Sequence, residues 1–216
     1  MKRYLPFAII AFVLAVAIGA GFYMFRSEQP QPSTTQASNT KASVSPTTSA
    51  SKGAVIVEEF GDYQCPPCGS LHPEMKKLKS EFGNRIRFIF YHLPLTVIHK
   101  NALDAAHAAV AAGLQGKFWE MHDMLYDSQK AWEETDNLRP IVAGYAGRLG
   151  LDVQKFLTDM DGPQVEATVA ADVRRANSLG VTGTPTLFVD GQEINNDDLT
   201  TENLRKIINQ RLSVRQ

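Results

Sequence analysis

The sequence predicts an α/β domain that is interrupted by a long α-helical insertion. Two strand-like segments, residues 54–60 and 85–93, stand on either side of a helical pattern. Helical patterns then continue from residue 95 to residue 180, and a last strand and helix follow them. Strands separated by helices are typical of α/β proteins, and a helical run of this length between two strands indicates an inserted unit.

A basic and then strongly apolar segment stands at the N-terminus. Lys2 and Arg3 precede an uncharged apolar run that ends at Phe25. Because ~20 apolar residues in a helix cross the ~30 Å hydrocarbon core of a bilayer, residues 1–26 are expected to anchor the chain in the membrane. The alternative is a cleaved signal peptide, but the run is long for one and no clean A-x-A cleavage site follows it. Either segment would carry the rest of the chain out of the cytoplasm.

Residues 27–52 form a low-complexity segment of Ser, Thr, Pro, Gln, Asn and Ala. Such a segment has little apolar surface to offset the entropy lost on ordering, so we expect a flexible linker. The folded domain then occupies residues 53–216. The net charge of the chain is −1 at pH 7, which gives no indication of a nucleic-acid partner.

The first strand and the first helix of the domain meet at the two cysteines. Residues 54–60, AVIVEEF, are apolar and β-branched, and Gly61 ends them. Gly83 ends the helix that follows. Apolar residues recur along this helix at the i, i+3, i+4 spacing of one face, namely Cys68, Leu71, Met75, Leu78 and Phe82.

The later elements complete the α/β order. In residues 85–93 the apolar residues Ile86, Phe88 and Phe90 alternate as in a strand. Helical patterns fill the expected insertion, at about residues 96–180, and Gly180 ends the last of them. The strand TLFVDG and the amphipathic helix NLRKIINQRL then close the domain.

The segment CPPC joins the first strand to the first helix and contains both cysteines of the chain. Cys65 is expected at the N-cap, with Pro66 at the first helical position, where the missing N–H has no intrahelical partner to lose. Pro67 removes a second donor, so the amides of Cys68 and Gly69 are the first ones free to face a Cys65 thiolate. These donors and the helix dipole favour the thiolate. We therefore expect an exposed Cys65 with a lowered pKa and a shielded Cys68.

Three interpretations of the cysteine pair are open at this point. A structural disulfide would close a very short loop and would constrain the unfolded chain little. A zinc or copper site would need two further ligands; His72 is the nearest candidate, whereas His122 lies on an aromatic-rich helix that favours packing. A dithiol that exchanges with other disulfides needs an activated thiol and a shielded partner after a strand. The expected geometry favours this third interpretation.

A second motif, GVTGTPTLFVDG, places Pro185 directly before the last strand. CPPC after one strand and GTPTLFV before another together resemble the thioredoxin superfamily. The segments FGDYQCPPC, YHLPL, HKNALDAAHAAVAA and GKFWEMHDMLY resemble its DsbA-like thiol–disulfide oxidoreductases, and the resemblance extends over residues 53–212. It implies an α/β, thioredoxin-like fold with an inserted α-helical domain.

The resemblance also implies the catalytic residues. Cys65 would be the nucleophile and Cys68 the resolving thiol. Glu59, six residues before Cys65, matches the buried acid that the family uses for proton transfer near the resolving thiol. A solvated carboxylate at the strand end is the alternative for Glu59, and the neighbouring Glu58 leaves the choice between the two acids open.

The substrate-binding residues follow from the same resemblance. Pro185 would form a cis peptide opposite the cysteines, and Thr184 would offer main-chain groups to an extended client. Pro66 and Pro67 would lie beside that client. Strongly oxidising members usually carry His at the position of Pro67, so we expect the Cys65 pKa in the middle or upper part of the ~3.5–7.5 range of activated thiols.

We expect a thiol–disulfide oxidoreductase in the cell membrane, single-pass, with its catalytic domain in the periplasm or cell exterior. It would act as a monomer, without cofactor or metal, on cysteine-containing exported proteins. A membrane quinone-linked oxidase, DsbB-like or vitamin K epoxide reductase-like, would reoxidise it. The alternatives are a membrane-tethered reductase of the cytochrome c maturation type and a redox-inert copper-binding module.

Overall fold

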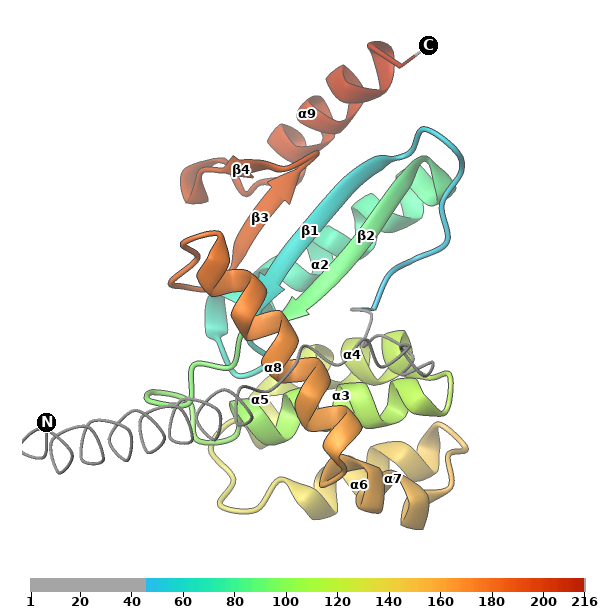
Figure 1. Ribbon diagram of the computed structural model, residues 1–216, viewed down its shortest axis with the longest axis vertical. Coiled ribbons are helices and arrows are strands. Elements are labelled where there is room, and N and C mark those ends of the chain that lie inside the picture. Colours follow the sequence, from blue (N-terminus) through green and yellow to red (C-terminus); the bar gives the residue numbers. More distant parts are fainter. Residues whose placement is uncertain (1–45, 216) are drawn as a thin grey trace, which may run out of the picture. The chain divides into compact units, whose positions relative to one another are not determined.

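The computed structural model describes residues 46–215 (Figure 1). Its sheet has the strand order β2-β1-β3-β4. These strands are β1 (Val55–Gly61), β2 (Ile86–His92), β3 (Thr186–Val189) and β4 (Gln192–Ile194). The helices are α2 (Pro66–Phe82), α3 (Ala102–Leu114), α4 (Phe118–Asp127), α5 (Gln129–Trp132), α6 (Arg139–Arg148), α7 (Val153–Met160), α8 (Pro163–Ser178) and α9 (Thr201–Ser213).

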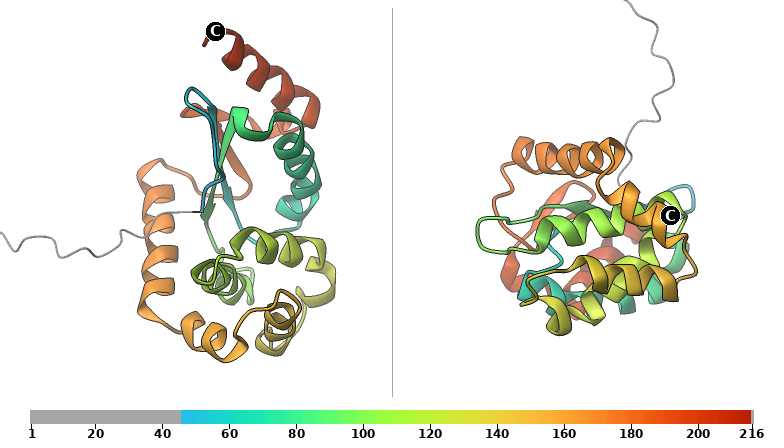
Figure 2. Two further views of the ribbon diagram at one scale, coloured as in Figure 1. Left: turned by 90° about the vertical axis from the view of Figure 1, so that its right-hand side faces the viewer. Right: turned by 90° about the horizontal axis from the view of Figure 1, so that it is seen from below.

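The sheet is mixed and is covered by helices on both faces. β1 pairs in parallel with β2 and antiparallel with β3, and β3 pairs antiparallel with β4. α2 and α9 lie on one face and α8 on the other (Figure 2). Because side chains alternate along a strand, Val57 faces the α2 layer whereas Phe60 packs beside α8.

Helices α3 to α8 lie between β2 and β3, which confirms the helical unit expected there. Their core is built around Trp132, Met121 and the alanine-rich α3. Cys65 and Cys68 belong to this same cluster, so the start of α2 packs against the insertion. The predicted α/β fold with inserted helices is confirmed.

The helix that follows the cysteines ends where the sequence predicts. α2 stops at Phe82, and Gly83 follows with φ 53°, a left-handed conformation that favours glycine. The N–H of Gly83 donates to the carbonyl of Lys79. The strand β4 is an element that the sequence did not predict, since its three residues carry too short a pattern.

Residues 46–51, which were assigned to the linker, lie along the outer edge of β2. The N–H of Phe90 donates to the carbonyl of Pro46 at 3.1 Å, and the N–H of Thr48 donates to the carbonyl of Phe88 at 2.9 Å. Ordered chain therefore begins before residue 53.

The predicted anchor, residues 1–26, and most of the predicted linker lie outside the described residues. Within residues 46–215, no helix combines the length and the apolar composition that crossing a membrane would require.

Candidate active site

Cys65 is the N-cap of α2, directly after the carboxyl end of β1. Its backbone is extended, with φ −70° and ψ 119°, and prolines occupy the first helical positions. The preceding turn is closed by the N–H of Cys65, which donates to the carbonyl of Asp62 at 3.1 Å. The Asp62 side chain accepts the N–H of Gln64 at 2.8 Å. The predicted strand–turn–helix context of the dithiol is thus present.

The loop before β3 lies against the cysteines. The Thr184–Pro185 peptide bond is cis, as the resemblance implies. In the thiol form, Sγ of Cys65 donates to the carbonyl of Thr184 at 3.3 Å. Cys65 was expected to be exposed, but only 5 % of it is accessible. That expectation was wrong because a sequence cannot show that the Thr184 loop lies over the sulfur.

The two thiols have opposite pKa shifts. The pKa of Cys65 is lowered to about 6, chiefly because the Cys68 thiol donates to its thiolate, with further help from the Thr184 hydroxyl and the Cys68 amide. Burial opposes this shift. The pKa of Cys68 is raised well above its ordinary value by burial and then by its interactions with Cys65 and Glu59. Gly69, the other expected donor, instead donates its N–H to the carbonyl of Cys65 at 3.1 Å.

The Thr184 hydroxyl is free to respond to ionisation of Cys65. Its oxygen is buried and makes no hydrogen bond within residues 46–215 when Cys65 is a thiol. A thiolate has no proton to donate to the Thr184 carbonyl, but it can accept one from the hydroxyl. The same residue therefore serves both protonation states of Cys65.

Glu59 is buried beneath the dithiol. It is 2 % exposed and alternates with Glu58 along β1, so it belongs to the α2 side of the sheet. Burial raises the pKa of Glu59 to about 7, and the positive charge of Lys79 on α2 opposes the rise. A carboxyl group with this pKa can hold or release a proton near neutral pH.

The neighbouring acid has a different environment. Glu58 lies on the other side of the sheet, where its carboxylate pairs with the Arg175 guanidinium of α8 at 2.6 Å. The structure therefore places Glu59, rather than Glu58, near the dithiol.

The insertion holds the active-site turn through side chains that the sequence did not single out. The Gln129 amide of α5 donates to the carbonyls of Tyr63 at 2.7 Å and Cys65 at 2.9 Å. A Cβ on Gly69 would stand 2.4 Å from Oε1 of Gln129, so this contact requires glycine. No periodicity marks Gln129, because its role depends on tertiary placement alone.

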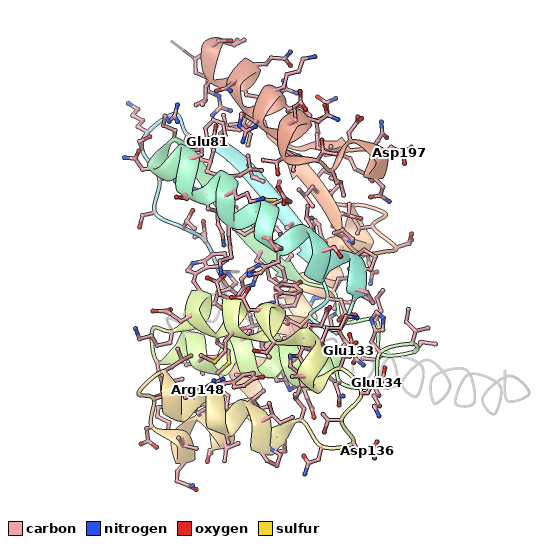
Figure 3. The ribbon with its side chains drawn as sticks, turned by 180° about the vertical axis from the view of Figure 1, so that it is seen from behind. Glu81, Glu133, Glu134, Asp136, Arg148 and Asp197 are labelled. Atoms are coloured by element: carbon pink, nitrogen blue, oxygen red, sulfur yellow. The ribbon has the colours of Figure 1, made fainter. Side chains whose placement is uncertain are left out.

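Gln64 makes a second connection to the insertion. Its amide donates to the carbonyl of Glu133 at 2.6 Å, and its oxygen accepts the N–H of Asn101 at 2.7 Å. Figure 3 shows Glu133, Glu134 and Asp136 close together on the segment after α5, whereas Glu81 marks the opposite end of α2. The turn before Cys65 is therefore fixed at its insertion side.

A groove of about 580 Å³ lies beside the cysteines, and it contains three of the predicted binding residues. Pro67, Thr184 and Pro185 line it, together with Ser70, Leu71, Glu74, Asn196 and Leu199. Pro66 is exposed at the helix start but does not line the groove. The arrangement can present Cys65 to an extended chain that lies in the groove.

The fold is shared with solved oxidoreductases. A thioredoxin-like oxidoreductase from Silicibacter pomeroyi DSS-3 has a TM-score of 0.64 and 27 % identity, over 77 % of this chain and 91 % of that chain. Oxidised BdbD from Bacillus subtilis has a TM-score of 0.69 and 22 % identity, over 78 % and 93 %. MdbA, a thiol–disulfide oxidoreductase from Corynebacterium diphtheriae, has a TM-score of 0.64 and 19 % identity, over 79 % and 90 %.

Curated relatives match a shorter part of the chain. The Na(+)/H(+) antiporter NhaA 1 of Salinispora arenicola is 44 % identical over 138 residues, which are 64 % of this chain and 20 % of that protein. The chain thus spans about a fifth of the length of this relative. The thioredoxin family model matches residues 43–210, which include the dithiol, Glu59 and Pro185. The chain therefore belongs to the thioredoxin family, and it carries its CPPC pair at the start of α2 in this fold.

Proposed function

We propose that the protein oxidises cysteine pairs in exported proteins by donating a Cys65–Cys68 disulfide. The observation that carries this proposal is the contrast between the two thiols, a lowered pKa at Cys65 and a raised one at Cys68. A low-pKa sulfur is a good leaving group, and its stabilised thiolate favours the reduced enzyme, which makes the disulfide an oxidant.

The proposed reaction has two exchange steps. A client thiolate attacks Sγ of Cys65, and Cys68 leaves as a thiolate that takes up a proton. A second client thiolate then attacks the client sulfur of the mixed disulfide and releases the Cys65 thiolate. The client dithiol is oxidised by two electrons, and the enzyme disulfide is reduced to the dithiol.

Glu59 is the proposed proton donor for Cys68. The raised pKa of Cys68 means that its thiolate must be protonated when it leaves, and Glu59 raises that pKa further by its charge. With a pKa of about 7, Glu59 is protonated in part of the molecules at neutral pH and can supply the proton.

The client would bind as an extended segment along the groove beside Pro67, Thr184 and Pro185. A second surface, the loop that carries Val97 and Ile98, suits an apolar partner. Val97 and Ile98 are 97 % and 70 % exposed, and Asp62 fixes their loop by accepting the N–H of Leu95 at 2.9 Å. We propose that a membrane quinone-linked oxidase contacts this loop, with the chain held in the cell membrane through residues 1–26.

A dedicated reductase is the second candidate. It is favoured by the two prolines between the cysteines, which supply neither charge nor an N–H donor. The Cys65 pKa of about 6 lies between the ~7 of thioredoxin and the ~3.5 of the strong oxidant DsbA. Intermediate stabilisation of the thiolate is compatible with either direction of electron flow.

Trapping of the redox state in the producing cell tests the direction. An oxidase keeps Cys65 and Cys68 mainly as a disulfide, whereas a reductase keeps them mainly as thiols; acid quenching and alkylation separate the two. Cys68→Ser should accumulate mixed disulfides with exported proteins through Cys65, and the matched Cys65→Ser variant should accumulate almost none. A mainly reduced pair in the cell would overturn the oxidase proposal.

A further inference from the structure

A second cluster of potential ligands lies one helical turn beyond the dithiol, at the contact of α2 with α4. His72 comes from α2, and His122 and Asp123 come from α4. Each residue offers one ligand atom, and these three atoms all lie within 4.8 Å of one another. His72 lies fifty positions before His122 in the sequence, so only the fold brings it to the two residues of α4.

The central ligand of the cluster is a buried imidazole nitrogen without a hydrogen bond. His72 is 2 % exposed, and its Nε2 makes no hydrogen bond within residues 46–215. It faces Oδ1 of Asp123 at 3.5 Å and Oδ1 of Asp127 at 3.4 Å. Leaving such a polar atom unpaired in the interior costs free energy.

These separations suit a tetrahedral metal ion. Zn²⁺ binds imidazole nitrogen and carboxylate oxygen at ~2.0–2.2 Å, which sets neighbouring ligand atoms ~3.3–3.5 Å apart in a tetrahedron. The distances from Nε2 of His72 to the two carboxylates already have this value. The ring nitrogen of His122 lies within 4.8 Å of the other two ligand atoms and would move closer to reach the same separation.

The surroundings orient the second imidazole. Nδ1 of His122 is hydrogen-bonded to the Tyr63 hydroxyl at 3.1 Å, the kind of outer contact that fixes a ligating histidine. The ring also packs edge-on against Phe90, and His72 stacks on Tyr126.

We propose that His72, His122 and Asp123 form a binding site for Zn²⁺ or a similar transition-metal ion, with Asp127 as the fourth ligand. Two imidazoles with carboxylates suit such ions, whereas Ca²⁺ and Mg²⁺ prefer oxygen alone. The site joins the active-site helix α2 to the insertion and is separate from the dithiol. It does not depend on the direction of thiol exchange.

Lys76 is the internal competitor for this site. Its ammonium lies 3.0 Å from Oδ2 of Asp127 and 3.8 Å from Oδ2 of Asp123, so it offsets part of the negative charge of the two carboxylates when no metal is bound. Its side chain is 40 % exposed and can turn into solvent when a metal ion enters. Lys79 is a second positive charge near the cluster, but its ammonium lies over the Trp119 ring at 4.7 Å from the ring centre.

The test uses the full chain with Cys65 and Cys68 oxidised to a disulfide, because free thiols would bind zinc themselves. Zinc is titrated in competition with a chromophoric chelator, and Co²⁺ is used for spectroscopy. We expect one ion per chain and tetrahedral Co²⁺ bands without sulfur-to-metal charge transfer. Asp123→Asn and His72→Gln should each weaken binding by at least about 10-fold.

Two further variants decide between a built site and incidental binding. Lys76→Gln should tighten zinc binding, because it removes the competing cation. His107→Gln, on α3 and outside the cluster, should bind zinc like the parent. Absence of stoichiometric uptake by the oxidised protein would overturn the proposal. Equal affinity in Asp123→Asn, a partly exposed position where the fold should tolerate the change, would also overturn it. Neither outcome bears on the proposed oxidation of clients, since no thiol exchange is measured.

Discussion

Replacement of Glu59 by Gln should stabilise the reduced protein against unfolding. This gain should be absent at pH 4 and should grow as the pH rises. The carboxyl has a pKa of about 7 in the folded protein against an ordinary 4.5, because burial penalises its charged form. The stability that protonated Glu59 contributes is complete below pH 4.5 and is lost as the pH rises toward 7. Gln keeps the shape of the protonated acid and has no proton to lose.

The magnitude follows from the pKa shift. One pKa unit is ~1.4 kcal/mol, so the shift corresponds to about 3 kcal/mol above pH 7, when the folded protein must ionise the buried acid. The gain of Glu59→Gln should thus be near zero at pH 4, about 1.4 kcal/mol at pH 5.5 and about 3 kcal/mol at pH 8. The pH dependence, rather than the gain at one pH, is the signature of a buried acid.

Urea denaturation of the reduced parent and variant at these three pH values measures the gain. Glu58→Gln is the matched control, because Glu58 lies on the opposite side of the sheet and loses its ion pair with Arg175 when replaced. It should not stabilise the protein at pH 8. A gain for Glu59→Gln that is the same at pH 4 and pH 8 would refute the buried, raised-pKa state.

Three other predictions concern the dithiol and its support. Thr184→Val removes the hydroxyl that donates to the thiolate, so it should raise the Cys65 pKa by roughly one unit, as measured by thiolate absorbance; an unchanged titration would contradict this role. Pro67→His should lower that pKa and raise the reduction potential by about 30 mV for each unit, and equilibration with glutathione would show no rise if the prolines do not control it. Gly69→Ala should destabilise by about 1–3 kcal/mol through overpacking against Gln129. The stability lost in Gly69→Ala, measured by thermal unfolding, should be smaller when Gln129 is also replaced by Ala. Equal losses with and without Gln129 would exclude this contact as the cause.

The sequence predicted the parts of the fold that depend on local pattern. The strand before Cys65 and the end of α2 at Phe82 follow from β-branched residues and from Gly83. The helical unit between β2 and β3 follows from its long amphipathic run. β4 was missed, because three residues cannot establish a period.

The features of the candidate site also fall into two groups, those that depend on local sequence and those that depend on contacts between distant segments. The low pKa of Cys65 is due chiefly to the Cys68 thiol, and the CPPC spacing that places this thiol beside Cys65 is a local feature. The burial of Cys65, the support from Gln129 and the choice of Glu59 over Glu58 depend on segments far apart in the chain. Spacing within one segment carries no information about such contacts.

The short stretch beside β2 bears on where the domain can be cut. The edge strands of the sheet are β2 and β4, and residues 46–51 cover the β2 edge through main-chain hydrogen bonds. An uncovered strand edge is a template for pairing with other chains. A fragment that begins at residue 53, the boundary suggested by composition, would leave seven residues of β2 open to such pairing. Expression of the folded domain should therefore start before Pro46, so that the sheet edge stays covered and the protein resists aggregation.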